Sequence, residues 1–486
     1  MKLNDPTLFR QQAFINGKWS DSYDGTSFDV TNPATTEVIG SVPNMGANET
    51  KQAIEEANSA WPKWRAKTAL ERSTILKRWH TLIEENQEDL AAIMTLEQGK
   101  SITEARGEIG YANSFIEWFA EEGKRVYGDT IPSKSADQRI IVSREPIGVC
   151  CAITPWNFPC AMITRKAAPA LAVGCPMIVK PAEATPFSAL ALAVLAERAG
   201  IPKGIFSVIT GDAKAIGEEM TSNPIVRKLT FTGSTAVGKL LMQQCAGTLK
   251  KVSLELGGNA PFIVFGDADL DKAVDGLMVS KYRNSGQTCV CTNRTLVHES
   301  VYDEFSKKLA LKVADLKVGD GFDADTNQGP LIDMKAVEKV EDHINDAVSK
   351  GAKILLGGKR HKLGKTFFEP TLLTNVTTDM RVTYEETFGP VAPLFSFKTE
   401  EQAIQMANDT EFGLAAYFYT NDMSRIWRVS EALEYGMVGV NAGLISTEVA
   451  PFGGVKESGI GREGSKYGVD EYLEMKYICM GGISND

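Results

Sequence analysis

GVCCAIT at residues 148–154 opens a stretch in which short apolar segments alternate with amphipathic ones, and this stretch decides the fold class. The further apolar segments are PMIVK (176–180), IFSVIT (205–210), RKLTFT (227–232) and KKVSLEL (250–256). The segments between them have helical spacing: AMITRKAAPALAVG (161–174), PFSALALAVLAERAG (186–200), DAKAIGEEMTS (212–222) and STAVGKLLMQQCAG (234–247). Strands that alternate with helices predict a doubly wound parallel α/β sheet, which binds ligands at the carboxyl ends of its strands.

A second series of the same kind follows from about Ala260. The expected strands are PFIVF (261–265), RTLVHE (294–299), AKILLGG (352–358), VAPLFSF (391–397) and GMVGVN (436–441). Helices are expected after Asp269 and over residues 302–315. The chain is therefore predicted to contain two α/β domains.

The flanking segments predict helices and peripheral strands. AFINGKWS (13–20) and residues 27–43 predict strands with Asn-Gly and Asn-Pro turns. Helices are expected over residues 49–66, over 69–98 with Gly99 as a stop, and over 102–123. RIIVSREP (139–146) and EYLEMKYICM (471–480) alternate like edge strands.

The amino-acid composition indicates a globular protein of two or three domains. The 486 residues are 43% hydrophobic and 23% charged, as in an ordinary globular protein, and at ~150 residues per domain they suggest two or three domains. The net charge of −10 argues against nucleic acid as a partner, because binding to phosphates needs a positive surface.

The cysteines and the apolar segments indicate the cellular compartment in which the protein is expected. Most of the eight cysteines lie in apolar surroundings, where a free thiol behaves as a small hydrophobic group. No signal peptide is visible before Asp5, and the apolar run 167–179 is interrupted by proline and glycine and is shorter than the ~20 residues of a membrane helix. We predict a cytoplasmic protein that makes no membrane contact.

Cys289 stands apart from the other cysteines because its neighbours in NSGQTCVCTNR (284–294) are polar. A thiol in such surroundings can ionise and react, although a structural thiol is an open alternative. Cys291 lies two residues further on, but no second cysteine pair and no histidine spacing completes a metal site, so no metal is predicted.

Glu255 is a candidate general base at the end of an expected strand, in LELGGNAP (254–261). Gly257 and Gly258 let other groups approach closely. An apolar environment raises the pKa of a carboxyl group and makes it suited to accepting a proton near neutral pH. The alternative is a glutamate paired with a backbone group or a lysine.

Two further strand ends carry polar residues. Asn157 in TPWNFP (154–159) is either a helix cap or an amide that donates to a developing oxyanion. Lys180 and Glu183 in KPAE are either turn residues or contacts to cofactor ribose. An acidic residue there suits a ribose 2′-hydroxyl and repels a 2′-phosphate.

Two glycine-rich strings resemble nucleotide-binding motifs but lack the required context. GSTAVGK (233–239) is followed by Leu240, whereas a P-loop needs Ser or Thr at that position. GIGREG (459–464) does not follow an expected strand inside a βαβ unit. Neither is interpreted as a standard fingerprint.

Seven motifs in order resemble those of the aldehyde dehydrogenase superfamily: PWNFP, KPAE, FTGS, LELGG, GQTC, EETFGP and PFGG. The strings YRNSGQTCVC, GLIS and GREGSKYGVDEYLE are similar to those of its succinate-semialdehyde dehydrogenase branch. The resemblance implies an α/β, aldehyde dehydrogenase-like fold. Its parts would be a Rossmann-type NAD-binding domain (1–126 and 147–254), a catalytic domain (255–466) and oligomerisation strands (127–146 and 467–486), in a homo-oligomer, either dimer or tetramer.

The resemblance also assigns roles to individual residues. Cys289 matches the nucleophile, Asn157 and the Cys289 backbone N–H match the oxyanion hole, and Glu255 matches the base that activates water. The cofactor contacts would be Trp156, Lys180, Glu183, Gly233, Ser234, Gly257, Glu386 and Phe388. Arg165, Arg283 and Ser446 match residues that hold a substrate carboxylate, although without the resemblance a structural ion pair is the favoured interpretation of each arginine.

The implied reaction is the oxidation of succinate semialdehyde to succinate with NAD, or NADP, through a thiohemiacetal and a thioester on Cys289. Glutarate semialdehyde is an alternative substrate. A relative that transfers the acyl group to coenzyme A would not need Glu255, and a catalytically silent structural protein would lack Cys289, Glu255 or Asn157. Cys291 is either an inert neighbour or the partner of Cys289 in a regulatory disulfide.

Overall fold

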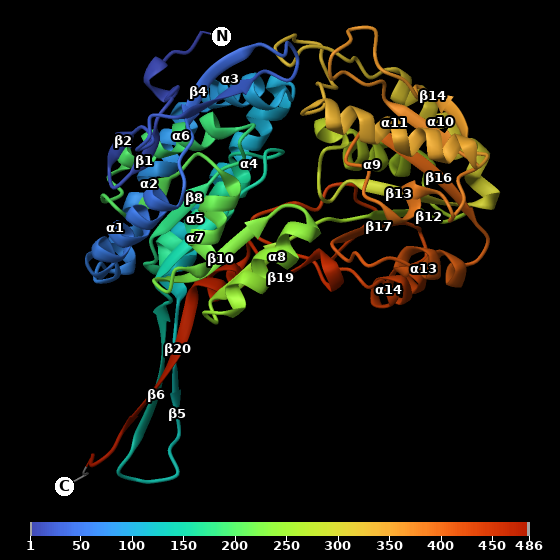
Figure 1. Ribbon diagram of the computed structural model, residues 1–486. Coiled ribbons are helices and arrows are strands. Elements are labelled where there is room, and N and C mark those ends of the chain that lie inside the picture. Colours follow the sequence, from blue (N-terminus) through green and yellow to red (C-terminus); the bar gives the residue numbers. More distant parts are fainter. Residues whose placement is uncertain (1, 484–486) are drawn as a thin grey trace.

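The computed structural model describes residues 2–483; Met1 and residues 484–486, at the outer ends of the predicted segments 1–126 and 467–486, lie outside the described part. Two α/β lobes lie side by side, and a narrow β-arm projects from the first of them (Figure 1). Among the described residues, no helix is both long enough and apolar enough to cross a membrane.

The first lobe is built on an eight-stranded sheet in the order β19-β11-β10-β7-β8-β9-β1-β2. Its central strands pair in parallel, as the alternation predicts: β7 (Val149–Ile153), β8 (Met177–Lys180), β9 (Phe206–Val208), β10 (Val226–Thr232) and β11 (Lys251–Glu255). Antiparallel strands extend both edges: β1 (Ala13–Ile15), β2 (Lys18–Ser20) and β19 (Gly459–Ile460). A separate ribbon pairs β3 (Ser27–Thr31) with β4 (Val38–Pro43).

Helices cover this sheet: α1 (Ala47–Arg65), α2 (Ala69–Glu85), α3 (Gln87–Gln98), α4 (Ile102–Glu122), α5 (Ala161–Val173), α6 (Pro186–Ala199), α7 (Ala213–Ser222) and α8 (Thr235–Ala246). The single helix expected over residues 69–98 is wrong, because the chain breaks at Asn86. The Asn86 side-chain amide donates to the Leu82 carbonyl (2.8 Å), and this bond caps α2. Gly99 ends α3 in a left-handed conformation, as expected of a stop.

The second lobe is built on a seven-stranded sheet in the order β14-β15-β16-β13-β12-β17-β18. The strands are β12 (Ala260–Val264), β13 (Thr292–His298), β14 (Lys353–Leu356), β15 (Thr371–Thr374), β16 (Val391–Phe397), β17 (Ala415–Tyr419) and β18 (Met437–Val440). The helices are α9 (Leu270–Tyr282), α10 (Tyr302–Ala314), α11 (Met334–Ser349), α12 (Arg381–Tyr384), α13 (Glu400–Asn408) and α14 (Met423–Ala432). Our sequence analysis did not predict β15, β17, α11, α13 or α14.

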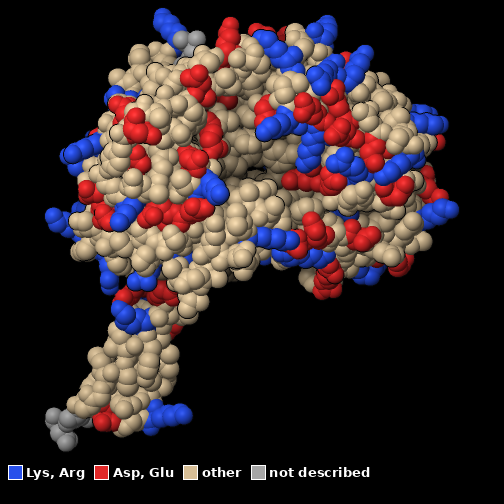
Figure 2. Space-filling model, viewed as in Figure 1, with Lys and Arg blue, Asp and Glu red and all other residues tan. Residues whose placement is uncertain are grey.

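The arm is a three-stranded sheet of β5 (Asp129–Ile131), β6 (Arg139–Pro146) and β20 (Leu473–Met480). β20 lies at its edge, as expected, but the prediction that residues 139–146 form an edge strand is wrong. β6 lies between β20 and β5, because both neighbours pair with it in antiparallel register. In the view of Figure 2, the middle of the arm presents mainly uncharged residues.

Strand register determines which residues meet between the lobes. Thr232 on β10 pairs with Glu255 on β11, and Phe231 pairs with Ile153 on β7. The carboxyl ends of these parallel strands therefore meet at one edge of the first sheet, facing the second lobe. The segment after β11 then crosses to β12 and starts the second sheet.

Candidate active site

A cavity of about 360 Å³ lies where the two lobes face one another, and a hollow is visible between them in Figure 2. The first lobe supplies the segments after β7 and β10, and the crossing segment supplies Leu256 and Gly257. The second lobe supplies Cys289, the start of α11 and residues 386–388. Residues from both lobes therefore form the site.

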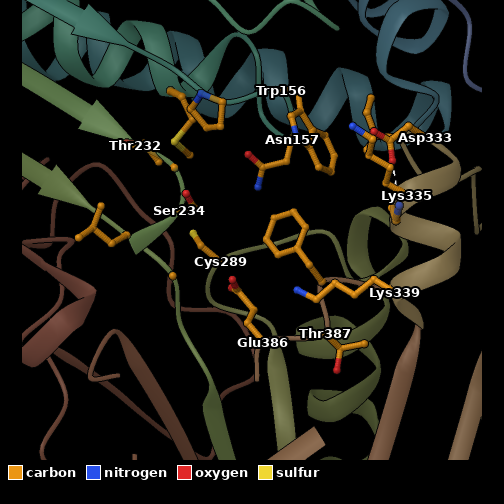
Figure 3. Close-up of a pocket in the computed structure, with 18 residues that line it drawn as sticks. Trp156, Asn157, Thr232, Ser234, Cys289, Asp333, Lys335, Lys339, Glu386 and Thr387 are labelled. Atoms are coloured by element: carbon orange, nitrogen blue, oxygen red, sulfur yellow. Dashed lines mark hydrogen bonds between the residues drawn. The ribbon is translucent and has the colours of Figure 1, made fainter. Parts of the chain in front are cut away.

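The thiol of Cys289 points into the middle of this cavity (Figure 3). The segment leading to it is folded back by three left-handed residues, Asn284 (φ 51°), Ser285 (φ 56°) and Gly286 (φ 74°). A side chain at Gly258 would place its Cβ 2.5 Å from the Cys289 carbonyl oxygen, so only glycine allows the two loops to approach this closely.

The electrostatic surroundings of Cys289 oppose ionisation. Burial raises the pKa of the thiol to about 12, the positive charge of Arg165 acts in the opposite direction, and the carboxylates of Glu386 and Glu255 raise the pKa further. Arg283 also lowers it. Because the thiolate is the reactive form, these two arginines are the groups that favour the nucleophile.

Asn157 is buried beside Cys289 and is not a helix cap. α5 begins only at Ala161, and the Asn157 amide donates to the Gln287 carbonyl across the lobe boundary (3.1 Å). The amide group carries two hydrogens, so one of them is left for another acceptor. Figure 3 shows the amide directed toward the same space as the Cys289 thiol.

Glu255 is buried behind the cavity wall. Burial raises its pKa well above the ordinary range, as expected, and the nearby Glu463 carboxylate raises it further. Its Oε2 atom has no hydrogen-bond partner among the described residues, so the alternative of a fully paired glutamate is not what the structure contains. A buried carboxyl group with a free oxygen is a suitable proton acceptor.

Most of the predicted cofactor contacts line the cavity. The Trp156 ring meets the Phe388 ring edge-on, with 5.6 Å between the ring centroids. Ser234 caps the N-terminus of α8, where partial positive charge favours an anion. Glu386 accepts a hydrogen bond from the Gly258 N–H (3.2 Å), and burial raises its pKa to about 7.

This part of the cavity fits a dinucleotide. At Gly257, an added Cβ would lie 3.2–3.3 Å from Phe412, Glu386 and Thr235, so the missing side chain keeps the wall open. A helix N-terminus for phosphates, a carboxylate for ribose hydroxyls and aromatic rings for a flat base are the groups that such a ligand requires.

The sequence analysis missed the contribution of α11. Lys335 and Lys339 line the cavity from this helix, and Figure 3 shows Lys339 extending toward Glu386. The positive charge of Lys339 lowers the pKa of Glu386, against the effect of burial. The amphipathic spacing of residues 334–349 could have predicted this helix, because Val337, Val340 and Ile344 recur at helical intervals and are buried on one face.

Lys180 and Glu183 do not line this cavity. Lys180 lies at the carboxyl end of β8 with its side chain buried, and its ammonium group forms an ion pair with the half-exposed carboxylate of Glu183. The two residues predicted to contact the cofactor ribose, Lys180 and Glu183, are therefore paired with each other outside this cavity.

A second cavity, of about 330 Å³, brings together Arg283 and Ser446, two of the three predicted substrate residues. The Arg283 guanidinium lies 5.3 Å from the centre of the Phe158 ring, and α4 forms one wall of the cavity. Phe158 and Asn284 also line it, and they adjoin Asn157 and the segment leading to Cys289 in the chain. Arg283 in this cavity lies close enough to Cys289 to lower the pKa of its thiol, so the cavity is near the nucleophile.

Arg165 is placed differently from Arg283. Its side chain is 1% exposed, forms an ion pair with Glu463, and lies over the Phe452 ring at 4.0 Å. It is not among the residues that line the second cavity. The helix that carries Arg165 was correctly predicted. The ion pair of Arg165 with Glu463, however, is of the structural kind that was the alternative to substrate binding.

Cys291 is buried, with its sulfur 3.6 Å from the Lys281 ammonium group and 3.2 Å from the Gly286 carbonyl oxygen. Burial raises the pKa of the Cys291 thiol, and the positive charge of Lys281 acts against this shift. Both Cys289 and Cys291 are free thiols in the structure. A regulatory disulfide between them stays a prediction.

Comparison with known proteins agrees with this architecture. A family model described as the aldehyde dehydrogenase family matches residues 19–478. The chain is 65% identical to the NADP-dependent succinate-semialdehyde dehydrogenase of Escherichia coli, over 99% of this chain and all of that one. It is also 65% identical to a glutarate-semialdehyde dehydrogenase of Pseudomonas aeruginosa, with the same coverage. A crystal structure of an NADP-dependent enzyme of E. coli superposes with a TM-score of 0.98, at 65% identity over 99% of this chain and all of that one.

Proposed function

The chain belongs to the aldehyde dehydrogenase family, and from this premise we propose that it oxidises succinate semialdehyde to succinate with a nicotinamide dinucleotide as the hydride acceptor. The family resemblance and the α/β fold predicted from the sequence are confirmed. The domain boundaries and the roles of single residues stay proposals.

The observation that carries the substrate assignment is the cavity beside Cys289. It offers a guanidinium group at Arg283 and a hydroxyl group at Ser446, next to the loop of the nucleophile. A planar guanidinium stays charged and binds a carboxylate through two hydrogen bonds. An aldehyde with a carboxylate at its far end therefore suits the site better than one with an apolar tail.

The first chemical step belongs to Cys289 and Asn157. The Cys289 thiolate adds to the aldehyde carbon and forms a thiohemiacetal, whose oxygen carries the developing negative charge. The second hydrogen of the Asn157 amide and the Cys289 backbone N–H are the donors proposed for this oxygen.

The second step releases the acid. Trp156, Ser234, Glu386 and Phe388 would hold a nicotinamide cofactor, which would supply the hydride acceptor for oxidation of the thiohemiacetal to a thioester. Glu255 then takes a proton from the water that attacks the thioester carbon; the C–S bond breaks, and the acid and the Cys289 thiolate are released. Its free, buried oxygen and its raised pKa support this role.

A panel of aldehydes tests the proposal. Initial rates with succinate semialdehyde, glutarate semialdehyde and butanal would be measured with NAD and with NADP, in the presence and absence of coenzyme A. We expect both carboxylated aldehydes to be preferred over butanal, with free acid as the product. A preference for glutarate semialdehyde would support the alternative, which the Pseudomonas aeruginosa relative favours; no preference for a carboxylate would overturn the proposal.

Replacing Arg283 by alanine is expected to lower kcat/KM for succinate semialdehyde roughly tenfold to a hundredfold, because one charge-assisted contact to the carboxylate is lost. Butanal has a similar length and no carboxylate, so its kcat/KM should fall much less, only by what the Arg283 charge contributes to the reactivity of the Cys289 thiol. Arg165→Ala is the informative comparison. Because Arg165 is buried in an ion pair with Glu463 and its charge lowers the pKa of Cys289, we expect this variant to lose thermal stability and to act on both aldehydes alike. Equal losses for both aldehydes in Arg283→Ala would contradict its role as the carboxylate contact.

For the cofactor we propose NAD, with NADP tolerated. Glu183 is exposed enough to turn toward ribose hydroxyls, which supports NAD, but its ion pair with Lys180 has no net charge and weakens the repulsion of a 2′-phosphate. Glu183→Ser should raise kcat/KM with NADP relative to NAD by roughly tenfold, because the Lys180 cation is then unpaired. Lys180→Met should shift the ratio the other way. An unchanged ratio in Glu183→Ser would show that other groups set the preference.

We also propose that the chain acts as a homo-oligomer joined through the arm. The arm exposes large apolar side chains, which monomeric proteins rarely gather on a projecting element: Ile131, Ile141, Met475, Tyr477, Ile478 and Met480. Sedimentation velocity distinguishes a dimer or tetramer from a monomer.

A further inference from the structure

One face of α4 forms a wall of the second cavity. Glu104, Gly107, Glu108 and Tyr111 all line it. Their spacing of three, one and three residues places them on one stripe of the helix, since an α-helix has 3.6 residues per turn. The stripe faces the space that also holds Arg283 and Ser446.

The two acidic groups of this stripe have partners within the protein. Glu104 accepts a hydrogen bond from the Asn284 N–H (2.7 Å). Glu108 forms an ion pair with the Lys100 ammonium group (2.5 Å) and accepts a bond from the Cys160 N–H (3.0 Å). Both carboxylates are therefore already engaged by groups of the protein.

The Tyr111 hydroxyl is different. It is buried, and it has no hydrogen-bond partner among residues 2–483. Buried hydroxyl groups are normally paired, because leaving one unpaired costs free energy. An unpaired hydroxyl in the wall of a cavity is explained if a ligand completes its hydrogen bonding.

The position of Tyr111 fits an anionic ligand. Its ring packs edge-on against Phe115, with 5.0 Å between the centroids, and this contact restrains the ring orientation. Burial raises the pKa of the phenol, while Arg165 and Arg283 lie close enough to lower it, so the hydroxyl stays protonated and can donate near two cations. Gly107, one turn earlier on α4, leaves open space beside it, because an added Cβ would meet no atom within 4 Å.

We propose that Tyr111 is a specificity-determining residue whose phenolic hydroxyl donates a hydrogen bond to the distal carboxylate of the aldehyde, opposite Arg283 and Ser446. The inference rests on the proposed function, because it concerns the same substrate. It adds the Tyr111 hydroxyl to the groups that bind the substrate carboxylate. Tyr111 lies on α4, where the sequence predicted no site residue.

Tyr111→Phe tests the inference, because it removes only the hydroxyl oxygen and keeps the ring packed on Phe115. We expect kcat/KM for succinate semialdehyde to fall roughly tenfold, mainly through KM, since a hydrogen bond to a charged group is lost. The constant for butanal should stay unchanged. Succinate should also become a roughly tenfold weaker inhibitor, whereas the melting temperature should not fall, because no contact within the protein is removed.

Tyr127→Phe is the matched control, since Tyr127 is 71% exposed and lies outside the cavity. Unchanged kinetics for both aldehydes in Tyr111→Phe, or equal losses for both, would overturn the role of Tyr111. If the wild-type enzyme prefers succinate semialdehyde over butanal and Tyr111→Phe keeps the full preference, only this inference fails. If the wild-type enzyme has no such preference, the proposed function and the inference fail together.

Discussion

Replacing Cys289 by alanine is expected to abolish aldehyde oxidation, with a loss in turnover on the order of 10⁵-fold or more, as for other enzymes that lose their nucleophile. Cys289 presents its thiol to the middle of the cavity beside the proposed oxyanion donor Asn157, and the proposed base Glu255 is close enough to raise the pKa of the thiol. An aldehyde cannot readily release hydride until a nucleophile has added to it, so the oxidation stops at its first step. Steady-state formation of NADH or NADPH measures the loss.

The same variant should still bind the cofactor, because Trp156, Ser234, Glu386 and Phe388 are unchanged. Quenching of tryptophan fluorescence by NADH would report this binding. Cys479→Ala is a suitable control, since Cys479 is an exposed thiol on the arm and should be dispensable for turnover. Substantial activity in Cys289→Ala would assign the nucleophile to another residue.

Replacing Glu255 by glutamine is expected to slow release of the acid by roughly 10²- to 10⁴-fold, the usual contribution of a general base. Hydride transfer precedes this step, so rapid mixing should show a fast burst of NADH or NADPH, one per active site, followed by a slow steady state. Acid quenching should recover a thioester on Cys289.

The pH profile provides a second measurement on Glu255. Only the ionised carboxylate can accept a proton, and burial raises the pKa of Glu255, so acid release by the wild-type enzyme should become faster as the pH rises through that pKa. Glu255→Gln should lose this rise. Glu218→Gln, at an exposed position of α7, controls for the change of charge. If Glu255→Gln kept the wild-type steady state and pH profile, another base would have to act.

The contrast between the two arginines illustrates how far sequence reasoning reaches. Both were assigned to the substrate carboxylate by resemblance. The structure places Arg283 in a cavity with Ser446, but buries Arg165 against Glu463. The pairing of Arg165 depends on a glutamate nearly three hundred positions away in the chain, and no local spacing reports such a contact.

The amino-acid sequence alone predicts the two α/β series, because alternation of apolar strands and amphipathic helices is a local property that each segment carries. It also predicts where two reactive groups lie relative to their strands: Glu255 ends β11, and Cys289 comes just before β13. These placements follow from where each apolar run stops or starts, because the apolar runs form the strands.

Tertiary packing determines which groups share a cavity and which neutralise one another. It pairs Lys180 with Glu183, brings Lys339 toward Glu386, and places Tyr111 of α4 in one cavity with Arg283 and Ser446, where its hydroxyl has no hydrogen-bond partner among residues 2–483. The physical reason is that the partner of a polar side chain depends on how distant elements pack, and the cost of leaving that side chain unpaired appears only once it is buried.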